Sequence, residues 1–243
     1  MAEKKKFIDH FSNGKIKAQG HYKNDKKDGK WTSYYKTGQI KAIDHYKNDK
    51  IEGKCTCYYK TGQIRAIGPY KNGKTEGKCT FYYKTGRIRA IEHFKNDKKE
   101  GKCSYYEKTT QIGGICYYKD DELHGKTLQF YPSGQKMLMG SFKNGISHGK
   151  FIRWFQNGNK EQEENWVNDL RNGKGTLWFE NGNKREIRHW KDGKKHGPSK
   201  TWFENGRKRY EGYYMNNIPS EQISLWDDDG NKWDETRIIY NLN

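Results

Sequence analysis

A glycine recurs every 24 residues along most of the chain, and this period constrains the fold more than any other feature. The series is Gly29, Gly53, Gly77, Gly101, Gly125, Gly149, Gly173 and Gly197. A second series lies nine residues later and is interrupted only at Thr110: Gly38, Gly62, Gly86, Gly134, Gly158, Gly182, Gly206 and Gly230. Such self-similarity is typical of repeat proteins, in which each unit packs only against its neighbours. It also disfavours helices, because each glycine inside a helix costs about 1 kcal/mol.

Aromatic residues recur with the same phase. One series contains Tyr34, Tyr58, Tyr82, Tyr106, Phe130, Trp154, Trp178 and Trp202, and most of its members are followed directly by a second aromatic residue. Another series contains Tyr22, Tyr46, Tyr70, Phe94, Tyr118, Phe142, Trp166, Trp190 and Tyr214. Tyrosine, tryptophan and the accompanying threonines and isoleucines favour strands.

Turn signals close each predicted strand. Asn24-Asp25, Asn72-Gly73 and Asp192-Gly193 belong to the dipeptide types that supply positive φ in hairpins. The second glycine series predicts another tight turn in each repeat, which leaves two strands of about 7–9 residues per repeat. The predicted fold class is all-β: an elongated, twisted, single-layer antiparallel sheet, in which tandem 24-residue β-hairpins form one meander.

Composition agrees with a thin structure. Hydrophobic residues are 31% of the chain and aromatic residues 15%, so burial depends on large rings and not on a thick aliphatic core. No apolar run approaches the ~18 residues of a membrane span, and no apolar stretch follows the basic start, so we expect neither a transmembrane segment nor a signal peptide. An odd number of cysteines, five, fits a reducing compartment, and we expect a cytoplasmic protein.

We interpret residues 1–243 as one repeat array with two surface characters. Residues 5–110 are basic, tyrosine-rich repeats, residues 111–217 are tryptophan- and phenylalanine-rich repeats, and residues 218–243 are a C-terminal cap. Residues 1–120 contain 28 Lys and Arg against 13 Asp and Glu, whereas residues 121–243 contain 20 against 17. A basic half favours anionic partners, although lysines that merely keep a flat sheet soluble explain the same charge.

Point-like sites are not expected. Cys55, Cys79 and Cys103 share one repeat position, so neighbours in this row are about 9.6 Å apart, too far for a disulfide. Cys55 and Cys57 are expected on opposite faces of one strand, and Cys116 is expected to stand alone. The histidines His124, His148 and His196 fall at a turn, a full repeat or more apart. We predict no metal site, no cofactor, no catalytic residues and no enzyme activity.

Two rows of residues are candidates for binding. Stacked cations could bind phosphates: Lys36, Lys41, Lys60, Arg65, Lys84 and Arg89. Tryptophans of the later repeats could form a protein-binding surface: Trp154, Trp166, Trp178, Trp190 and Trp202.

These repeats resemble the MORN repeat in its variant form, a G-K-W-x-x-Y-Y-x-x-G core followed by a strand and a K-N-G turn. The segments 29–38 and 196–206 match it closely, and the resemblance covers roughly residues 5–240. It implies a sheet of stacked antiparallel hairpins with non-catalytic roles. Variant-repeat proteins of bacteria are often named antitoxins, and other MORN proteins act as scaffolds, dimerise or have been proposed to bind phosphoinositides.

Two functions are therefore expected. The first is a protein-interaction module, either an intracellular scaffold or an antitoxin-like inhibitor of a partner protein. The second is binding of anionic phospholipid or nucleic acid through the basic N-terminal half. Homo-oligomers could form through the sheet faces or edges.

Overall fold

The structure, a computed structural model, describes residues 4–109 and 111–233, and every regular element in these ranges is a β-strand. Thr110, where the second glycine series is interrupted, and residues 234–243 of the predicted cap lie outside the described residues. Within the described ranges there is no helix long and apolar enough to cross a membrane. The chain divides into two compact units, Met1–Glu122 and Leu123–Asn243.

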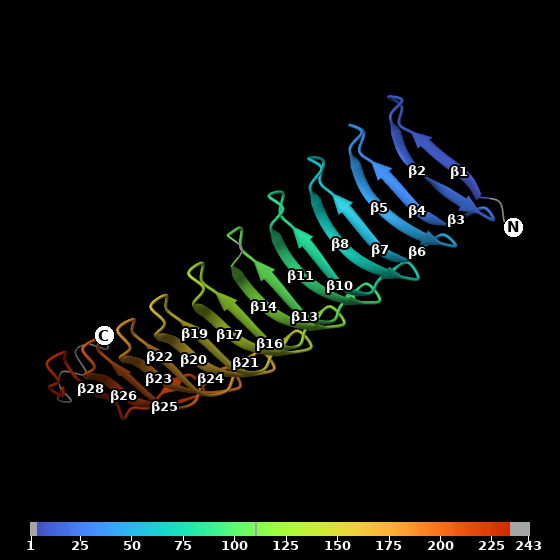
Figure 1. Cartoon of the computed structure of the whole chain (residues 1–243). Helices are drawn as coiled ribbons and strands as arrows, with labels where there is room; N and C mark the ends of the chain where they lie inside the picture. The colour runs from blue at the N-terminus through green and yellow to red at the C-terminus, as the bar shows by residue number, and fades with distance from the viewer. Residues whose placement is uncertain (1–3, 110, 234–243) are drawn as a thin grey trace. The chain divides into compact units, whose positions relative to one another are not determined.

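The first unit contains fourteen complete strands, which follow one another as in Figure 1. They are β1 (Lys4–His10), β2 (Ile16–Lys23), β3 (Lys26–Lys27), β4 (Gly29–Tyr34), β5 (Ile40–Lys47), β6 (Lys50–Ile51), β7 (Gly53–Tyr58), β8 (Ile64–Lys71), β9 (Lys74–Thr75), β10 (Gly77–Tyr82), β11 (Ile88–Lys95), β12 (Lys98–Lys99), β13 (Gly101–Tyr106) and β14 (Ile112–Lys119). The two-residue strand β15 (Glu122–Leu123) lies where the units meet in the sequence.

The second unit repeats the same order of elements. Its strands are β16 (Gly125–Phe130), β17 (Lys136–Lys143), β18 (Ile146–Ser147), β19 (Gly149–Trp154), β20 (Lys160–Val167), β21 (Leu170–Arg171), β22 (Gly173–Trp178), β23 (Lys184–Lys191), β24 (Lys194–Lys195), β25 (Gly197–Trp202), β26 (Lys208–Met215), β27 (Ile218–Pro219) and β28 (Ser224–Leu225). The predicted cap thus begins with β27 and contains β28.

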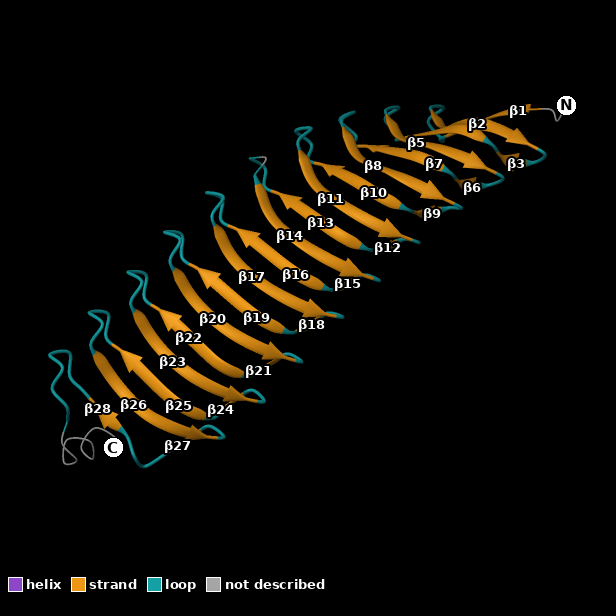
Figure 2. Ribbon diagram, turned by 60° about the horizontal axis from the view of Figure 1, so that its bottom comes forward, coloured by secondary structure: helices purple, strands orange, loops and turns teal. Residues whose placement is uncertain are grey.

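Each repeat is an antiparallel hairpin of a six-residue and an eight-residue strand, followed by a two-residue strand. β4 pairs with β5, and β5 pairs in turn with β6 and β7. Within each unit the hairpins therefore form a single layer (Figure 2), and the predicted meander of tandem hairpins is confirmed. The prediction of two strands per repeat missed the two-residue strand, because the chain leaves the tight turn by pairing briefly with the strand it has just completed.

Positive backbone angles explain both glycine series and the Asn-Asp turns. Asn48 and Asp49 have φ of 50° and 67°, as a two-residue hairpin turn with two left-handed residues requires. Gly29 and Gly38 have φ of 78° and 100°, which side-chain-bearing residues adopt only at a cost.

A register shift recurs in the hairpins. Ser33 pairs with Ala42 but Tyr34 pairs with Ile40, so Lys41 is the extra residue of a β-bulge. Equivalent shifts occur in β10–β11, β16–β17, β19–β20, β22–β23 and β25–β26. The bulge places Ile40, the residue before Lys41, on the side of the sheet that simple alternation would not give.

A second set of bonds joins neighbouring hairpins at their other end. The Tyr35 and Tyr59 hydroxyls donate to the backbone carbonyls of Tyr58 and Tyr82, each at 2.7 Å. Where phenylalanine replaces the tyrosine, an asparagine two residues later bonds a different carbonyl of the next hairpin. Asn157 Nδ2, after Phe155, donates at 2.8 Å to the carbonyl of Glu180, two residues beyond the position of the tyrosine's acceptor. Neighbouring hairpins are thus joined at this end by a tyrosine hydroxyl in some repeats and by an asparagine amide in others.

Few side chains are fully covered, as a single layer dictates. The buried apolar side chains in the described residues are Trp31, Cys55, Cys79, Ala90, Cys103, Ile152 and Leu177. The aromatic series are mostly half-buried, which confirms that large rings and not an aliphatic core shield the sheet.

Candidate functional site

Each hairpin presents two faces, which the register defines. Trp31 pairs with Asp44 and Thr32 with Ile43, and successive side chains point to opposite sides of a strand. We call face A the side that carries Trp31, Asp44 and Tyr46, and face B the side that carries Thr32, Ile43 and Tyr34. The same names apply to equivalent residues of every repeat.

Face A is built by matching sizes between neighbouring hairpins. A Cβ atom on Gly20 would lie 2.3 Å from Trp31 Cδ2, and one on Gly140 would lie 2.3 Å from Phe151 Cε1. These glycines therefore make room for the large ring of the next hairpin. In the hairpins between, smaller residues such as Cys79 occupy the position of Trp31.

Cations cover the aromatic row of face A. The Lys27 ammonium is 4.4 Å from the Trp31 ring centroid, and that of Lys99 is 5.0 Å from the Tyr118 centroid. In the second unit the Arg171 guanidinium is 5.1 Å from the centroids of both Trp166 and Trp190. Such cation–π contacts contribute about 0.5–2 kcal/mol each, more when they are shielded from water.

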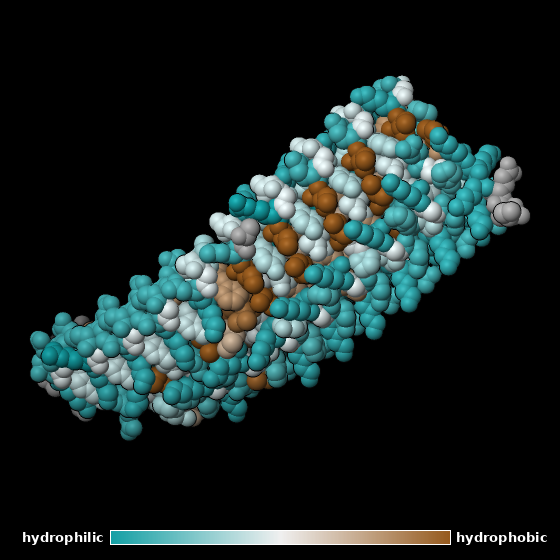
Figure 3. Space-filling model, viewed as in Figure 1, coloured by the Kyte–Doolittle hydropathy of each residue, from teal (hydrophilic) through white to brown (hydrophobic). Residues whose placement is uncertain are grey.

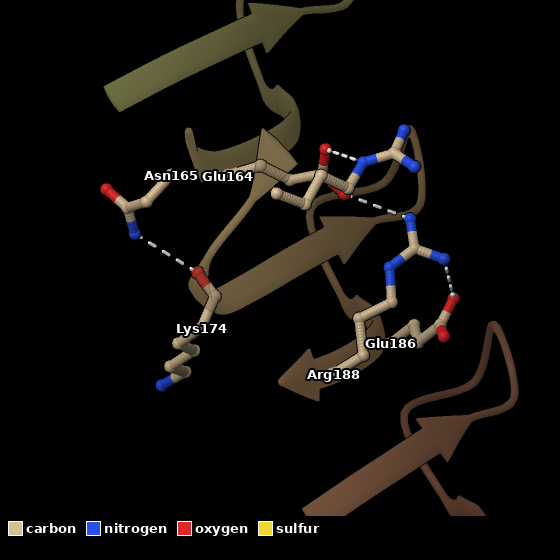
Figure 4. Close-up of polar contacts among 6 residues, drawn as sticks. Glu164, Asn165, Lys174, Glu186 and Arg188 are labelled. Carbon is tan, nitrogen blue, oxygen red and sulfur yellow. Dashed lines mark hydrogen bonds and ion pairs between the residues drawn. The ribbon is translucent and has the colours of Figure 1, made fainter. Parts of the chain in front are cut away.

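A buried carboxylate holds the centre of this row in the second unit. Glu164 is 1% exposed and accepts bonds from Arg171 Nε at 2.8 Å and Arg188 Nη2 at 3.1 Å. Arg188 also reaches Glu186, 3.3 Å from its Oε2 (Figure 4). Gly175 allows this arrangement, because a Cβ there would come within 3.3 Å of Glu164 Cγ. Both oxygens of the Glu164 carboxylate are thus paired with guanidinium groups, so this carboxylate is not free to act on a ligand.

The five candidate tryptophans do not form one surface. Trp154, Trp178 and Trp202 end six-residue strands and belong to face B, whereas Trp166 and Trp190 belong to face A. All five are half-buried. On face B lysines lie over them: Lys136 is 5.8 Å from the Trp154 centroid and Lys160 is 5.5 Å from that of Trp178. The role of these residues in protein binding stays a prediction.

Face B of the first unit exposes aliphatic side chains instead. Ile40, Ile64 and Ile112 are 37%, 36% and 38% exposed, and the half-buried Ile43 and Ile67 lie on the same face. Figure 3 shows paired apolar patches that recur from hairpin to hairpin over the first unit. Exposed lysines at the position of Lys30 share this face. The isoleucines were visible in the sequence, but their exposure depends on the bulge, which puts Ile40 on the side of Tyr34.

The six candidate cations are exposed and lie in two places. Lys36, Lys60 and Lys84 are in the turns between strands, whereas Lys41, Arg65 and Arg89 are at the bulge. Arg89 reaches face A, where its guanidinium carbon is 5.6 Å from the Phe81 centroid. Within residues 4–109 and 111–233, none of the six forms an ion pair. Their anion-binding role stays a prediction.

Two expectations about cysteines are wrong. Cys55 and Cys57 lie on the same face, because residues two apart in a strand point the same way, and both line one hollow together with Cys79. Cys116 does not stand alone but pairs directly across the sheet with Cys103. Burial raises the pKa of Cys79 to about 11, and also raises the pKa values of Cys103 and Cys116. Cys79, Cys103 and Cys116 therefore remain protonated at neutral pH, which fits packing residues better than nucleophiles, whereas hydrogen bonds with Cys55 and Arg65 lower the pKa of Cys57 to about 6.

Histidines and carboxylates make local structural bonds. His45 Nδ1 lies 3.1 Å from the Lys54 carbonyl, and His124 Nδ1 lies 3.1 Å from Asn144 Oδ1. Asp49 Oδ1 accepts the Lys27 amide at 2.7 Å, and Glu52 Oε2 accepts the Asn72 amide at 2.8 Å. No three His, Cys, Asp or Glu side chains are grouped as a metal site requires in the part of the chain that the structure describes.

Comparisons with known proteins agree with the repeat. The sequence profile of the MORN repeat variant matches residues 6–24, 27–48, 51–72, 75–96, 123–144, 147–168 and 195–216, and that of the MORN repeat matches residues 93–106 and 165–184. No curated protein sequence was found to match the chain.

Solved structures give only slight similarity. The crystal structures of TcdB2-TccC3 and of TcdB2-TccC3-Cdc42 are each 10% identical, with TM-scores of 0.23 and 0.22. The alignments cover 91% and 90% of this chain but only 14% and 15% of those chains. Similarity at this level carries no argument about fold or function.

Proposed function

Because the chain belongs to the MORN repeat family, whose repeats are interaction modules, we propose that it is a non-catalytic module that binds a partner protein. The observation that carries this proposal is the exposed aliphatic row on face B of the first unit. Ile40, Ile64 and Ile112 recur at a fixed repeat position with more than a third of their surface in water. Contiguous apolar patches on a protein surface mark interaction sites, and Figure 3 shows apolar patches recurring over these hairpins.

Charge indicates the kind of partner. Exposed lysines at the positions of Lys30, Lys54 and Lys78 share face B with the isoleucines, and the whole chain carries +18. A second copy of the chain would bring like charges together, so face B fits an acidic protein surface with aliphatic side chains at its centre. In the cytoplasm such a partner would make the protein a scaffold or an antitoxin-like inhibitor.

The test compares three forms of the full chain as bait for the product of the adjacent gene and for host-cell extract. Ile40→Ser with Ile64→Ser changes face B, and Ile146→Ser, 41% exposed in the second unit, is the matched control. We expect an acidic protein to be retained by the wild type and the control and to be lost at least tenfold with the double variant. Equal retention by all three forms, or no retained protein, would overturn the proposal.

A second candidate function is binding of an anionic surface, phospholipid or nucleic acid, by the basic N-terminal half. It is favoured by a difference between the carboxylates and the candidate cations of the first unit. Carboxylates such as Asp49, Glu52 and Asp97 accept backbone amides of neighbouring hairpins, whereas the six candidate cations form no ion pair within the described residues.

This candidate predicts affinity that falls steeply with salt, with a slope of about one unit per contacted phosphate for nucleic acid. Replacing Lys41, Arg65 and Arg89 by serine should weaken binding to duplex DNA or to vesicles with anionic lipid. Unchanged affinity in that triple variant would exclude the bulge cations as the binding row.

A further inference from the structure

A hollow of about 560 Å³ opens on face A of the second unit. Its lining includes the cations Arg185, Lys195 and Arg209 and the rings of Phe179, Tyr210 and Tyr214. Small-molecule sites usually measure about 300–1,000 Å³, so the hollow is of a size to hold a compact ligand.

The lining of the hollow includes one small residue, Ser199. Ser199 pairs directly with Gly212 across β25 and β26, where other hairpins hold pairs such as Trp31 and Asp44. The Tyr210 side chain lies over Gly212, since a Cβ there would come 2.2 Å from its hydroxyl oxygen, and this ring forms one wall of the hollow. Thr201, two residues after Ser199 on the same face, adds a second hydroxyl to the lining.

The hollow carries an excess of positive charge. Arg185, Lys195 and Arg209 form no ion pair within residues 4–109 and 111–233. The one carboxylate of the lining, Glu186, is already bound to Arg188 at 3.3 Å. Lys195 lies 5.0 Å from the Tyr214 centroid, so this cation is held beside an aromatic wall.

Arg185 and Arg209 occupy the same repeat position as Arg65 and Arg89 of the first unit. There the surroundings differ: the hollow between those hairpins is lined by cysteines, aliphatic residues and aromatic rings and by no arginine. Arginines at this repeat position therefore line a polar hollow in the second unit, whereas those of the first unit do not.

We propose that the hollow between Arg185 and Arg209 binds a small phosphomonoester that carries a flat ring, the chemistry shared by mononucleotides and aryl phosphates. Guanidinium groups bind phosphate oxygens in a bidentate, charge-assisted manner, and the Ser199 and Thr201 hydroxyls supply further donors. The rings of Phe179 and Tyr214 provide faces on which a flat group can stack. This site is independent of the partner surface on face B.

Isothermal titration calorimetry of the full chain with phenyl phosphate, AMP and inorganic phosphate tests the proposal. We expect phenyl phosphate or AMP to bind at least tenfold more tightly than inorganic phosphate. Preference for phenyl phosphate alone would identify the aryl phosphate as the ligand class, and preference for AMP alone the mononucleotide. No measurable binding of either at millimolar concentration, or equal affinity for inorganic phosphate, would overturn it.

Matched variants test the location. Arg185→Gln with Arg209→Gln should weaken binding at least tenfold, whereas Lys143→Gln with Lys174→Gln, which removes the same charge from exposed positions outside the hollow, should leave it unchanged. Equal losses in both pairs would show that overall charge and not the hollow attracts the ligand. All four residues are exposed, so both variants are expected to fold, and unchanged circular dichroism and melting temperature check this.

Discussion

The hydrogen bond from a tyrosine hydroxyl to the next hairpin makes a quantitative prediction. Later repeats join the same hairpin ends by an asparagine amide, which offers a comparison within the chain. The Tyr59 hydroxyl donates to the Tyr82 carbonyl at 2.7 Å. Tyr59→Phe removes this neutral hydrogen bond and leaves a partly buried carbonyl without its donor. The expected loss is about 1 kcal/mol of unfolding free energy. For a chain of this size that corresponds to a fall in melting temperature of about 2–4 °C.

The later repeats indicate how another donor can join the same hairpin ends. Phe155, Phe179 and Phe203 are each followed two residues later by an asparagine, and Asn181 Nδ2 donates to the Glu204 carbonyl at 3.0 Å. Thr61 holds the position of that asparagine in the early repeat. Adding Thr61→Asn to Tyr59→Phe should therefore add a bond to the Lys84 carbonyl and recover part of the lost stability, while the Tyr82 carbonyl stays without its donor.

Urea unfolding followed by circular dichroism measures both effects, with Tyr58→Phe as the control on the adjacent residue. Tyr58 has no side-chain hydrogen bond within the described residues, so its variant should change stability by less than about 0.5 kcal/mol. The reasoning is refuted if Tyr59→Phe is as stable as the wild type, or if the double variant remains as unstable as the single one.

Three further predictions concern Glu164 and Gly140 on face A and Glu211 on face B. Glu164→Gln should cost about 1–3 kcal/mol, because the partly exposed Arg171 and the largely covered Arg188 lose their bonds to a buried carboxylate, and urea unfolding beside the exposed Glu180→Gln measures the difference. Gly140→Val should cost at least about 1–3 kcal/mol through its clash with Phe151, and adding Phe151→Cys should recover part of it if size matching is the cause. Lys200 and Lys208 lower the pKa of Glu211 from 4.5 to about 2, so the contribution of Glu211 to the unfolding free energy is present above pH 4.5 and is lost as the pH falls towards 2. Glu211→Gln should therefore flatten the dependence of the unfolding free energy on pH between 4.5 and 2. An unchanged dependence in the variant contradicts this.

Much of the fold was predictable because its determinants are local. The 24-residue period, the Asn-Asp and Asn-Gly turns and the two glycine series each require only a few consecutive residues to be read. The two-residue strands were missed because they carry no pattern of their own, and the bulge at Lys41 was missed because a one-residue register shift leaves the sequence periodicity intact.

The sites were less predictable because they depend on which side chains meet across strands. The tryptophans share composition but not a face, and the pairing of Cys103 with Cys116 follows from strand register alone. Arg185 and Arg209 could have been found by extending the row of Lys41, Arg65 and Arg89 into the later repeats. That Ser199 pairs with Gly212, and that Tyr210 lies over this glycine beside the hollow, required the register.

The structural demands on one repeat leave a definite set of positions free for function. The turns need positive φ, and the hairpin junction needs either the tyrosine or the asparagine donor, so these positions are fixed. On face A the size of one side chain is constrained only by the size of its neighbour on the next hairpin. The pairs Gly20–Trp31 and Asp44–Cys55 fill the equivalent space in two repeats. The same matching holds beside the hollow: Arg188 and Ser199 occupy the positions of Gly20 and Trp31, and a Cβ on Gly212 would meet Tyr210 and Ile223. The positions that the repeat leaves free are therefore exposed ones such as Arg185 and Arg209 at the bulges, and it is there that the sheet can be expected to bind a ligand.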